Sequence, residues 1–143
     1  MPALPLARAW PATQWLLIEA NGRRARFLSQ AVHRLGLTER VRVRAERAER
    51  LGREAGERGR HQAVVARGFG APAVTAECGA PFLGAGGRLL TSEPPDQRLW
   101  PPDRLAELGL AVVGRRGSVM VLEQERLCPE RFPRRSPGKR PLF

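Results

Sequence analysis

One stretch of the sequence strongly limits the possible folds. In it, an apolar run leads through a tight turn into an amphipathic helix. Residues 14–19, QWLLIE, are apolar up to a closing acid, as in a strand buried on both faces. Asn21-Gly22 predicts a turn, and residues 23–36 place their apolar side chains on one helical stripe that ends at Gly36. A strand buried on both faces needs helices on each side, so the pattern indicates a parallel α/β sheet.

The same alternation continues along the chain. Strands are predicted at residues 14–19, 40–44, 63–67 and 88–93, and helices at 3–10, 23–36, 72–83 and 102–110. GAGG at 84–87 is expected to form a turn. AVVGRR and SVMVLEQER then predict an antiparallel pair of strands around Gly117. We therefore expect one α/β domain over residues 1–143, with a basic, proline-rich tail at 126–143.

Composition narrows the possible partners. The 143 residues are 42% hydrophobic, enough for a core, and carry a formal net charge of +11. Lys139 is the only lysine; a coding bias toward arginine explains that ratio but not the net charge, which favours a polyanion such as RNA. Cys78 and Cys128 lack zinc-ligand spacing, so a reduced, cytoplasmic protein without metal is expected. No apolar run reaches the ~20 residues of a membrane span.

Three segments resemble one protein family. RAERAERLG, AVVARGFGAPAVTAECGAPFLGAGGRLL and the ending ERFPRRSPGKRPL look like the ribosomal RNA small-subunit methyltransferase G family (glucose-inhibited division protein B). The ending is the most specific, with Phe132 in place of the family's tyrosine, and the resemblance runs from Leu4 to Phe143. It implies a Rossmann-like class I methyltransferase fold, S-adenosyl-L-methionine as cofactor, and N7-methylguanine in 16S ribosomal RNA of the small subunit as product.

The resemblance also implies an incomplete N-terminus. In the family, a first strand and a loop of the type GSGAGFPG precede LPLA, whereas this chain begins MPALPLA. The first strand and the glycine-rich cofactor loop are therefore expected to be missing, through a gene-start error, a true truncation or a fragment. The strands at 14–19 and 63–67 would then lack a partner unless they close together or another chain supplies a strand. Weak or no cofactor binding by this chain alone is expected.

Two candidate cofactor residues stand at predicted strand ends. Glu19 closes a strand, where an acid can accept hydrogen bonds from both ribose hydroxyls; an exposed acid with no ligand is the alternative. Arg67 follows AVVA and matches the arginine of the family's TARAV, which lines the cofactor site. A guanidinium is costly to place there unless it is paired. The resemblance implies cofactor-binding roles for both residues.

A further cofactor contact is implied for Ala48 and Glu49, which match the AE of the family's GRAEE segment. The small side chain of Ala48 would allow the backbone to approach the adenine closely, and the carboxylate of Glu49 would orient the loop. An ordinary charged helix is the alternative, and Ala45-Glu46 offers the same dipeptide three residues earlier. The sequence SEPP at 92–95 stands where the family usually has a lysine, which indicates a divergent subgroup.

The tail is the candidate RNA-binding segment. Glu130 is its only acid, and an aromatic residue lies among its cations. The segment could therefore bind phosphates and stack a base. Composition fits a solubilising surface tail equally well, and the family match favours RNA. The candidate residues are Arg131, Phe132, Arg134, Arg135, Lys139 and Arg140.

The resemblance predicts an enzyme, a methyltransferase active on ribosomal RNA and monomeric when full length. No Ser/His/Asp set is evident, and neither His33 nor His61 is placed as a catalyst. Guanine N7 loses no proton before attack, so this reaction requires mainly alignment and favourable electrostatics. The alternative is a non-catalytic, basic RNA- or ribosome-binding remnant that no longer holds cofactor.

Overall fold

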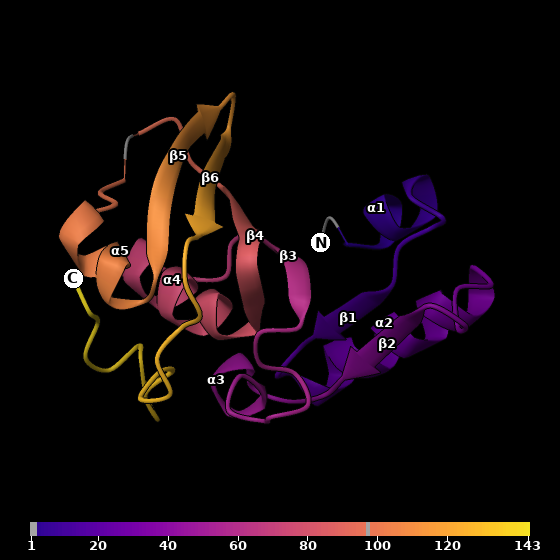
Figure 1. Ribbon diagram of the computed structural model, residues 1–143. Coiled ribbons are helices and arrows are strands. Elements are labelled where there is room, and N and C mark those ends of the chain that lie inside the picture. Colours follow the sequence, from indigo (N-terminus) through magenta and orange to yellow (C-terminus); the bar gives the residue numbers. More distant parts are fainter. Residues whose placement is uncertain (1–2, 97) are drawn as a thin grey trace. The chain divides into compact units, whose positions relative to one another are not determined.

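The structure is a computed structural model that describes residues 3–96 and 98–143 (Figure 1). The chain divides into two compact units, Met1–Ala48 and Glu49–Phe143.

The N-terminal unit is a strand–helix–strand segment preceded by a short helix. It contains α1 (Ala3–Ala9), β1 (Trp15–Ile18), α2 (Gly22–Arg34) and β2 (Val41–Arg44). β1 and β2 pair in parallel, from Trp15 opposite Val41 to Ile18 opposite Arg44. Apolar residues of both helices and both strands form one core, including Ala7, Leu17, Leu28, Val32 and Val41. The predicted strand, turn and amphipathic helix are confirmed as elements. The expected burial of the strand on both faces is wrong, because β1 belongs to a two-stranded sheet and only its Leu17 is buried.

The start of α2 is fixed by its cap. The side-chain oxygen of Asn21 accepts hydrogen bonds from the backbone N–H groups of Arg23 and Arg24, both at 3.1 Å. These are two of the N–H groups that a helix otherwise leaves unsatisfied. The cap therefore ends β1 and begins α2 within four residues, which also fixes the position of Glu19 between them.

The C-terminal unit is built on a four-stranded sheet. After α3 (Ala48–Leu51), which starts at the last residue of the N-terminal unit, its elements are β3 (His61–Ala66), α4 (Pro72–Gly79), a 3-10 turn (Ala80–Phe82), β4 (Leu83–Ser92), α5 (Pro102–Glu107), β5 (Leu110–Arg116) and β6 (Val119–Gln124). The strand order is β3-β4-β6-β5, with β3 and β4 parallel and the last two pairs antiparallel.

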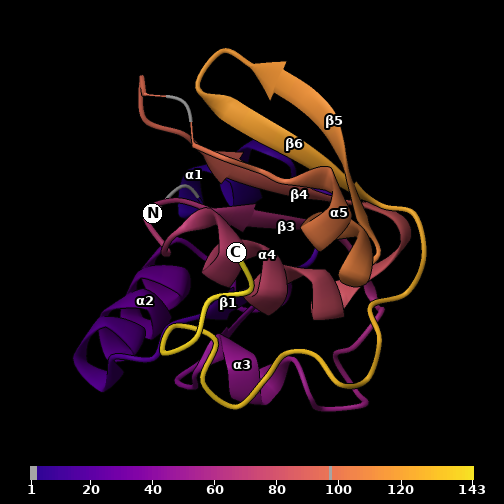
Figure 2. The ribbon, with the colours of Figure 1, turned by 90° about the vertical axis from the view of Figure 1, so that its left-hand side faces the viewer.

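Helices α4 and α5 lie on the same face of this sheet (Figures 1 and 2). Fully buried leucines join the sheet to the helices: Leu89, Leu105, Leu108 and Leu122. The antiparallel hairpin predicted at the end of the sheet is confirmed, and Gly117 turns it with a φ of +60°. A parallel pair closed by an antiparallel hairpin is the arrangement expected of the C-terminal half of a Rossmann-like methyltransferase sheet.

One predicted element differs. The GAGG segment at 84–87 does not form a separate turn, because β4 runs from Leu83 through it to Ser92. The register of the β3–β4 ladder shifts between His61, opposite Leu83, and Ala63, opposite Arg88. Gly86 has a φ of +79°, so the glycines make an irregular stretch inside the strand.

The tail after β6 is ordered against the C-terminal unit. Phe132 is 3% exposed and belongs to the core of that unit, together with Cys128. The guanidinium of Arg58 donates to four backbone carbonyls: those of Gly52, Cys128, Pro129 and Phe132. These bonds hold the first part of the tail to the loop that follows α3.

No helix in residues 3–96 and 98–143 has the length and apolar character needed to cross a membrane.

Candidate cofactor and nucleic-acid site

Glu19 directly follows β1, at the carboxyl end of a parallel strand. Its Oε1 accepts a hydrogen bond from the backbone N–H of Asn21 at 2.8 Å, and Oε2 lies 3.8 Å from Nε of Arg24. The side chain is 19% exposed, so the carboxylate is oriented but still accessible. Ligands of open α/β sheets bind outside the carboxyl ends of the strands, and a ribose diol is a suitable partner for such an acid.

Arg67 directly follows β3, at the carboxyl end of the other parallel pair. Ala66 pairs with Thr91 of β4, so Arg67 and the end of β4 share one sheet edge. Arg67 is exposed, which removes the desolvation cost that a buried guanidinium would carry. An exposed cation at this edge is available to a polar ligand.

Ala48 and Glu49 begin helix α3, and both are half-buried. The alternative dipeptide Ala45-Glu46 lies in the connection between β2 and α3. Glu19 and Ala48 belong to the N-terminal unit, and Glu49 and Arg67 belong to the C-terminal unit. The cofactor-binding roles of all four remain a prediction.

The tail residues divide into two groups. Arg131, Arg135, Lys139 and Arg140 are exposed, and the guanidinium of Arg131 lies 4.8 Å from the centre of the Phe132 ring. Phe132 itself is 3% exposed, so the predicted base stacking on its ring is wrong: the ring packs in the core and has no free face.

Arg134 is also committed within the fold. Its Nε and Nη2 donate to the two carboxylate oxygens of Glu77 at 2.8 and 2.5 Å, and its backbone N–H donates to Oε1 at 2.7 Å. Hydrogen bonding to Glu77 raises the pKa of Arg134 above its usual value. Its predicted role as a free phosphate contact is therefore corrected: this guanidinium neutralises a fully buried acid.

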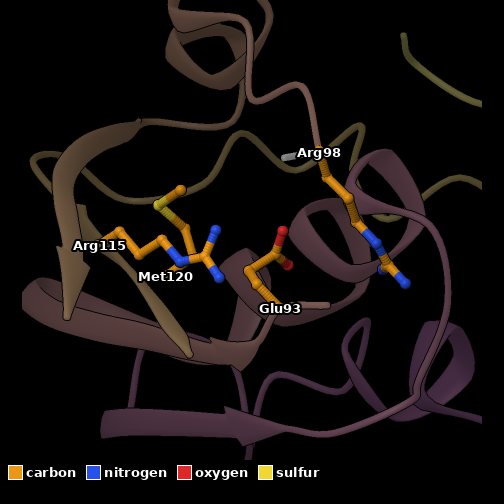
Figure 3. Close-up of a pocket in the computed structure, with 4 residues that line it drawn as sticks. All are labelled: Glu93, Arg98, Arg115 and Met120. Carbon is orange, nitrogen blue, oxygen red and sulfur yellow. The ribbon is translucent and has the colours of Figure 1, made fainter. Parts of the chain in front are cut away.

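A small pocket of about 180 Å³ lies beside the end of β4, lined by Glu93, Arg98, Arg115 and Met120 (Figure 3). Glu93 directly follows β4 and is 7% exposed. Its backbone N–H donates to the carbonyl of Ser118 at 2.7 Å, and its Oε2 accepts from the indole N–H of Trp100 at 3.3 Å. Among the residues that the structure describes, none hydrogen-bonds Oε1.

Sequence reasoning missed Glu93 and Glu77 as individual residues. Glu93 lies in the SEPP segment that marks the divergence from the family, and its signal was an acid placed directly after an apolar strand. The signal for Glu77 was an acid inside the apolar run of α4, AVTAECGA. A buried acid requires a partner, but the sequence does not say which arginine supplies it.

The alternation of strands and helices, the closing hairpin and the acid at the end of β1 define a Rossmann-like class I methyltransferase fold. Two solved structures are similar to the chain. A Corynebacterium glutamicum protein has a TM-score of 0.54 at 20% identity, over 80% of this chain and 62% of that one. An O-methyltransferase family protein from Burkholderia thailandensis has a TM-score of 0.50 at 15% identity, over 88% of this chain and 56% of that one.

Residues 1–93 match the family model described as rRNA small subunit methyltransferase G. The chain is 35% identical to the Ribosomal RNA small subunit methyltransferase G of Rubrobacter xylanophilus, over 99% of this chain and 61% of that protein. It is also 35% identical to the same enzyme of Chloroflexus aggregans, over 99% of this chain and 65% of that one. The chain belongs to the rRNA small subunit methyltransferase G family and spans about two-thirds or less of the length of these relatives.

Proposed function

We propose that the chain provides the ribose-binding and RNA-binding parts of an S-adenosyl-L-methionine-dependent methyltransferase that modifies N7 of a guanine in 16S ribosomal RNA. Membership of the family supports the reaction class. The names of the curated relatives support ribosomal RNA of the small subunit as substrate. Such a substrate would place the protein in the cytoplasm.

The observation that carries the proposal is the geometry of Glu19. One carboxylate oxygen is held by the N–H of Asn21, and the side chain remains accessible at the carboxyl end of a parallel strand. A carboxylate has about four lone-pair positions, so it can accept from the ribose hydroxyls while keeping the bond to Asn21. Glu19 therefore fits the ribose of the cofactor, and Arg67 fits a polar group at the edge of β3 and β4.

When bound, S-adenosyl-L-methionine supplies an electrophilic methyl group. N7 of guanine carries an exposed lone pair, so no residue of this chain has to remove a proton before the methyl group is transferred. The contribution of the chain is then to position the nucleotide and to provide favourable electrostatics. The exposed cations of the tail, Arg131, Arg135, Lys139 and Arg140, supply phosphate contacts that hold the RNA.

A methyl-transfer assay with 16S ribosomal RNA and radiolabelled cofactor tests the reaction, and chemical cleavage at N7-methylguanine locates the product. It should be run on the chain itself and on the chain extended by any in-frame upstream codons. Incorporation at a guanine N7 supports the proposal. RNA binding without incorporation in either form would support a non-catalytic RNA-binding protein instead.

Two variants test the cofactor residues; they are made in the chain extended by any in-frame upstream codons, because weak or no cofactor binding is expected of this chain alone. Glu19→Gln keeps an amide oxygen to accept from Asn21 but loses the charge, so cofactor affinity should fall while α2 stays capped. Arg67→Ala should also lower cofactor affinity. Arg116→Ala, which removes an exposed arginine at the end of β5, is the matched control and should leave it unchanged. Equal affinity in the Arg67 variant and the control would remove Arg67 from the site.

A further inference from the structure

Two described side chains of the C-terminal unit, Glu93 and Gln124, have an oxygen that is buried without a hydrogen-bond partner, and Glu93 is the one that lines a described cavity. Glu93 is 7% exposed, and among the described residues nothing hydrogen-bonds its Oε1. Most buried polar atoms in proteins are paired, so an unpaired carboxylate oxygen requires an explanation. Here the oxygen belongs to a residue that lines a cavity, which points to a binding site for a ligand that carries a hydrogen-bond donor.

The charges around the cavity restrict what that ligand can be. Arg98 and Arg115 line the cavity together with the single acid, so the site carries a net positive charge. A cationic ligand would meet two guanidinium groups, whereas an anionic ligand with a neutral donor edge satisfies all three residues. The volume of about 180 Å³ lies below the roughly 300–1,000 Å³ of pockets for drug-sized ligands, so it suits one ring system.

We propose that Glu93 recognises the substrate guanine by accepting hydrogen bonds from N1–H and the N2 amino group on the Watson–Crick edge of the base. This inference rests on the proposed function and adds the basis of its base specificity. An ionised carboxylate only accepts hydrogen bonds. Guanine presents two adjacent donors on that edge. Adenine, cytosine and uracil each place an acceptor beside a donor on that edge, so one carboxylate oxygen would face an acceptor and make no hydrogen bond.

The position of Glu93 agrees with attack by N7. The Watson–Crick edge and N7 lie on opposite sides of guanine, so a base held through N1 and N2 leaves N7 free. Glu93 follows β4, and Arg67 follows β3 at the same sheet edge. The proposed base-recognition residue, Glu93, and the proposed cofactor contact, Arg67, therefore lie at the same edge of one sheet.

The remaining lining residues complete the recognition. Arg115 extends from β5 toward Glu93 (Figure 3), while its Nε and Nη2 donate to the carbonyls of Gly117 and Pro94 at 2.7 and 3.2 Å. A guanidinium held in this way offers a flat face on which an unstacked base can lie. Met120 provides an apolar wall. Nη1 of Arg98 donates to the carbonyl of Gly70 at 3.2 Å, and its exposed guanidinium adds positive charge beside the cavity.

Nucleotide binding without cofactor tests the inference. GMP, IMP and AMP are titrated into the full chain by calorimetry or ligand-observed NMR. IMP lacks only the N2 amino group, so it should bind about tenfold more weakly than GMP, and AMP should bind more weakly still. Because no methyl group is transferred in this measurement, its result is independent of whether the chain proves to be an active methyltransferase.

A variant pair assigns the preference to Glu93. Glu93→Gln replaces one acceptor by a donor and should abolish the GMP preference. Glu123→Gln, which changes an acid paired with Arg88 on the same sheet, should keep it. Circular dichroism checks that both variants fold. Equal affinity of the unmodified chain for GMP and AMP, or a GMP preference that survives in folded Glu93→Gln, would overturn the inference. If Glu93→Gln does not fold, the three-nucleotide series decides alone.

Discussion

The carboxylate of Glu77, which has no exposed surface, is neutralised by the guanidinium of Arg134 from 57 residues further along the chain. The two groups form a bidentate pair, and the backbone N–H of Arg134 adds a third hydrogen bond. A buried acid in the apolar helix α4 is tolerated only because the tail delivers this cation. The tail is therefore a structural part of the C-terminal unit as well as a candidate RNA contact.

Removing Arg134 should destabilise the C-terminal unit strongly. Arg134→Ala leaves Glu77 buried without its cation, and we expect the free energy of unfolding to fall by about 2–3 kcal/mol. This value is below that of a fully buried pair, because the Arg134 side chain is 36% exposed. Urea unfolding followed by circular dichroism measures the change. Arg135→Ala, an exposed neighbour, should change stability by less than about 0.5 kcal/mol.

The stability of the chain should fall in alkali because of Cys128. Burial raises the pKa of this thiol from 9.0 to about 11, although Arg58 opposes the shift. Between these values the unfolded chain loses the thiol proton while the folded chain keeps it, so unfolding becomes easier as pH rises. The expected loss is about 1 kcal/mol at about pH 10, relative to about pH 8.

The matched comparison is Cys128→Ala, which has no thiol to titrate at this position and should lack this part of the pH dependence. Urea unfolding of both proteins at the two pH values isolates the contribution of Cys128. The same loss in both proteins would show that another group causes it.

Gly109 should not tolerate a side chain. Its φ is +80°, and a Cβ atom there would lie 2.3 Å from the carbonyl oxygen of Arg126. Gly109→Ala therefore adds backbone strain to a steric clash, and we expect a loss of about 3 kcal/mol or more in thermal or urea unfolding. Gly56→Ala is the control: no described residue comes within 4 Å of its added Cβ, so it should be neutral or slightly stabilising.

The salt dependence of RNA binding should reveal the tail contacts. Replacing its exposed cations by alanine removes up to four ionic contacts, which should lower the slope of log affinity against log salt by up to about 3. The four residues are Arg131, Arg135, Lys139 and Arg140. Filter binding at several salt concentrations measures the slope. An unchanged slope would show that the tail does not contact RNA phosphates, and the RNA-binding surface would then be sought at the arginines of α2.

The elements were largely predictable from sequence because local patterns determine them. The apolar run at Trp15–Ile18, the Asn21 cap and the turn at Gly117 are each set by residues close in the chain. GAGG was predicted wrongly as a turn, because β3 pairs with the residues on both sides of it, Leu83 and Arg88, and β4 runs through it without a break. Here contacts between strands decide the structure, and local propensity does not.

The candidate site was predictable only where it depends on strand ends. Glu19 and Arg67 lie at the carboxyl ends of parallel strands, and the order of elements is enough to place them. Phe132 and Arg134 were assigned to RNA because a basic tail with an aromatic residue looks exposed in sequence. Their actual partners, the core and Glu77, lie far away along the chain, and local pattern does not identify such contacts.

The hydrogen bonds of Arg58 set an order in which the C-terminal unit can fold during synthesis. Its partners Cys128, Pro129 and Phe132 follow it by 70 to 74 residues. A ribosome adding about 5–20 residues per second needs several seconds to supply them. During that interval the Arg58 guanidinium and the Glu77 carboxylate lack their hydrogen-bond partners in the tail. The C-terminal unit therefore cannot complete its packing until the tail residues have been synthesised. A message that ends before Arg134 would leave this unit permanently unfinished.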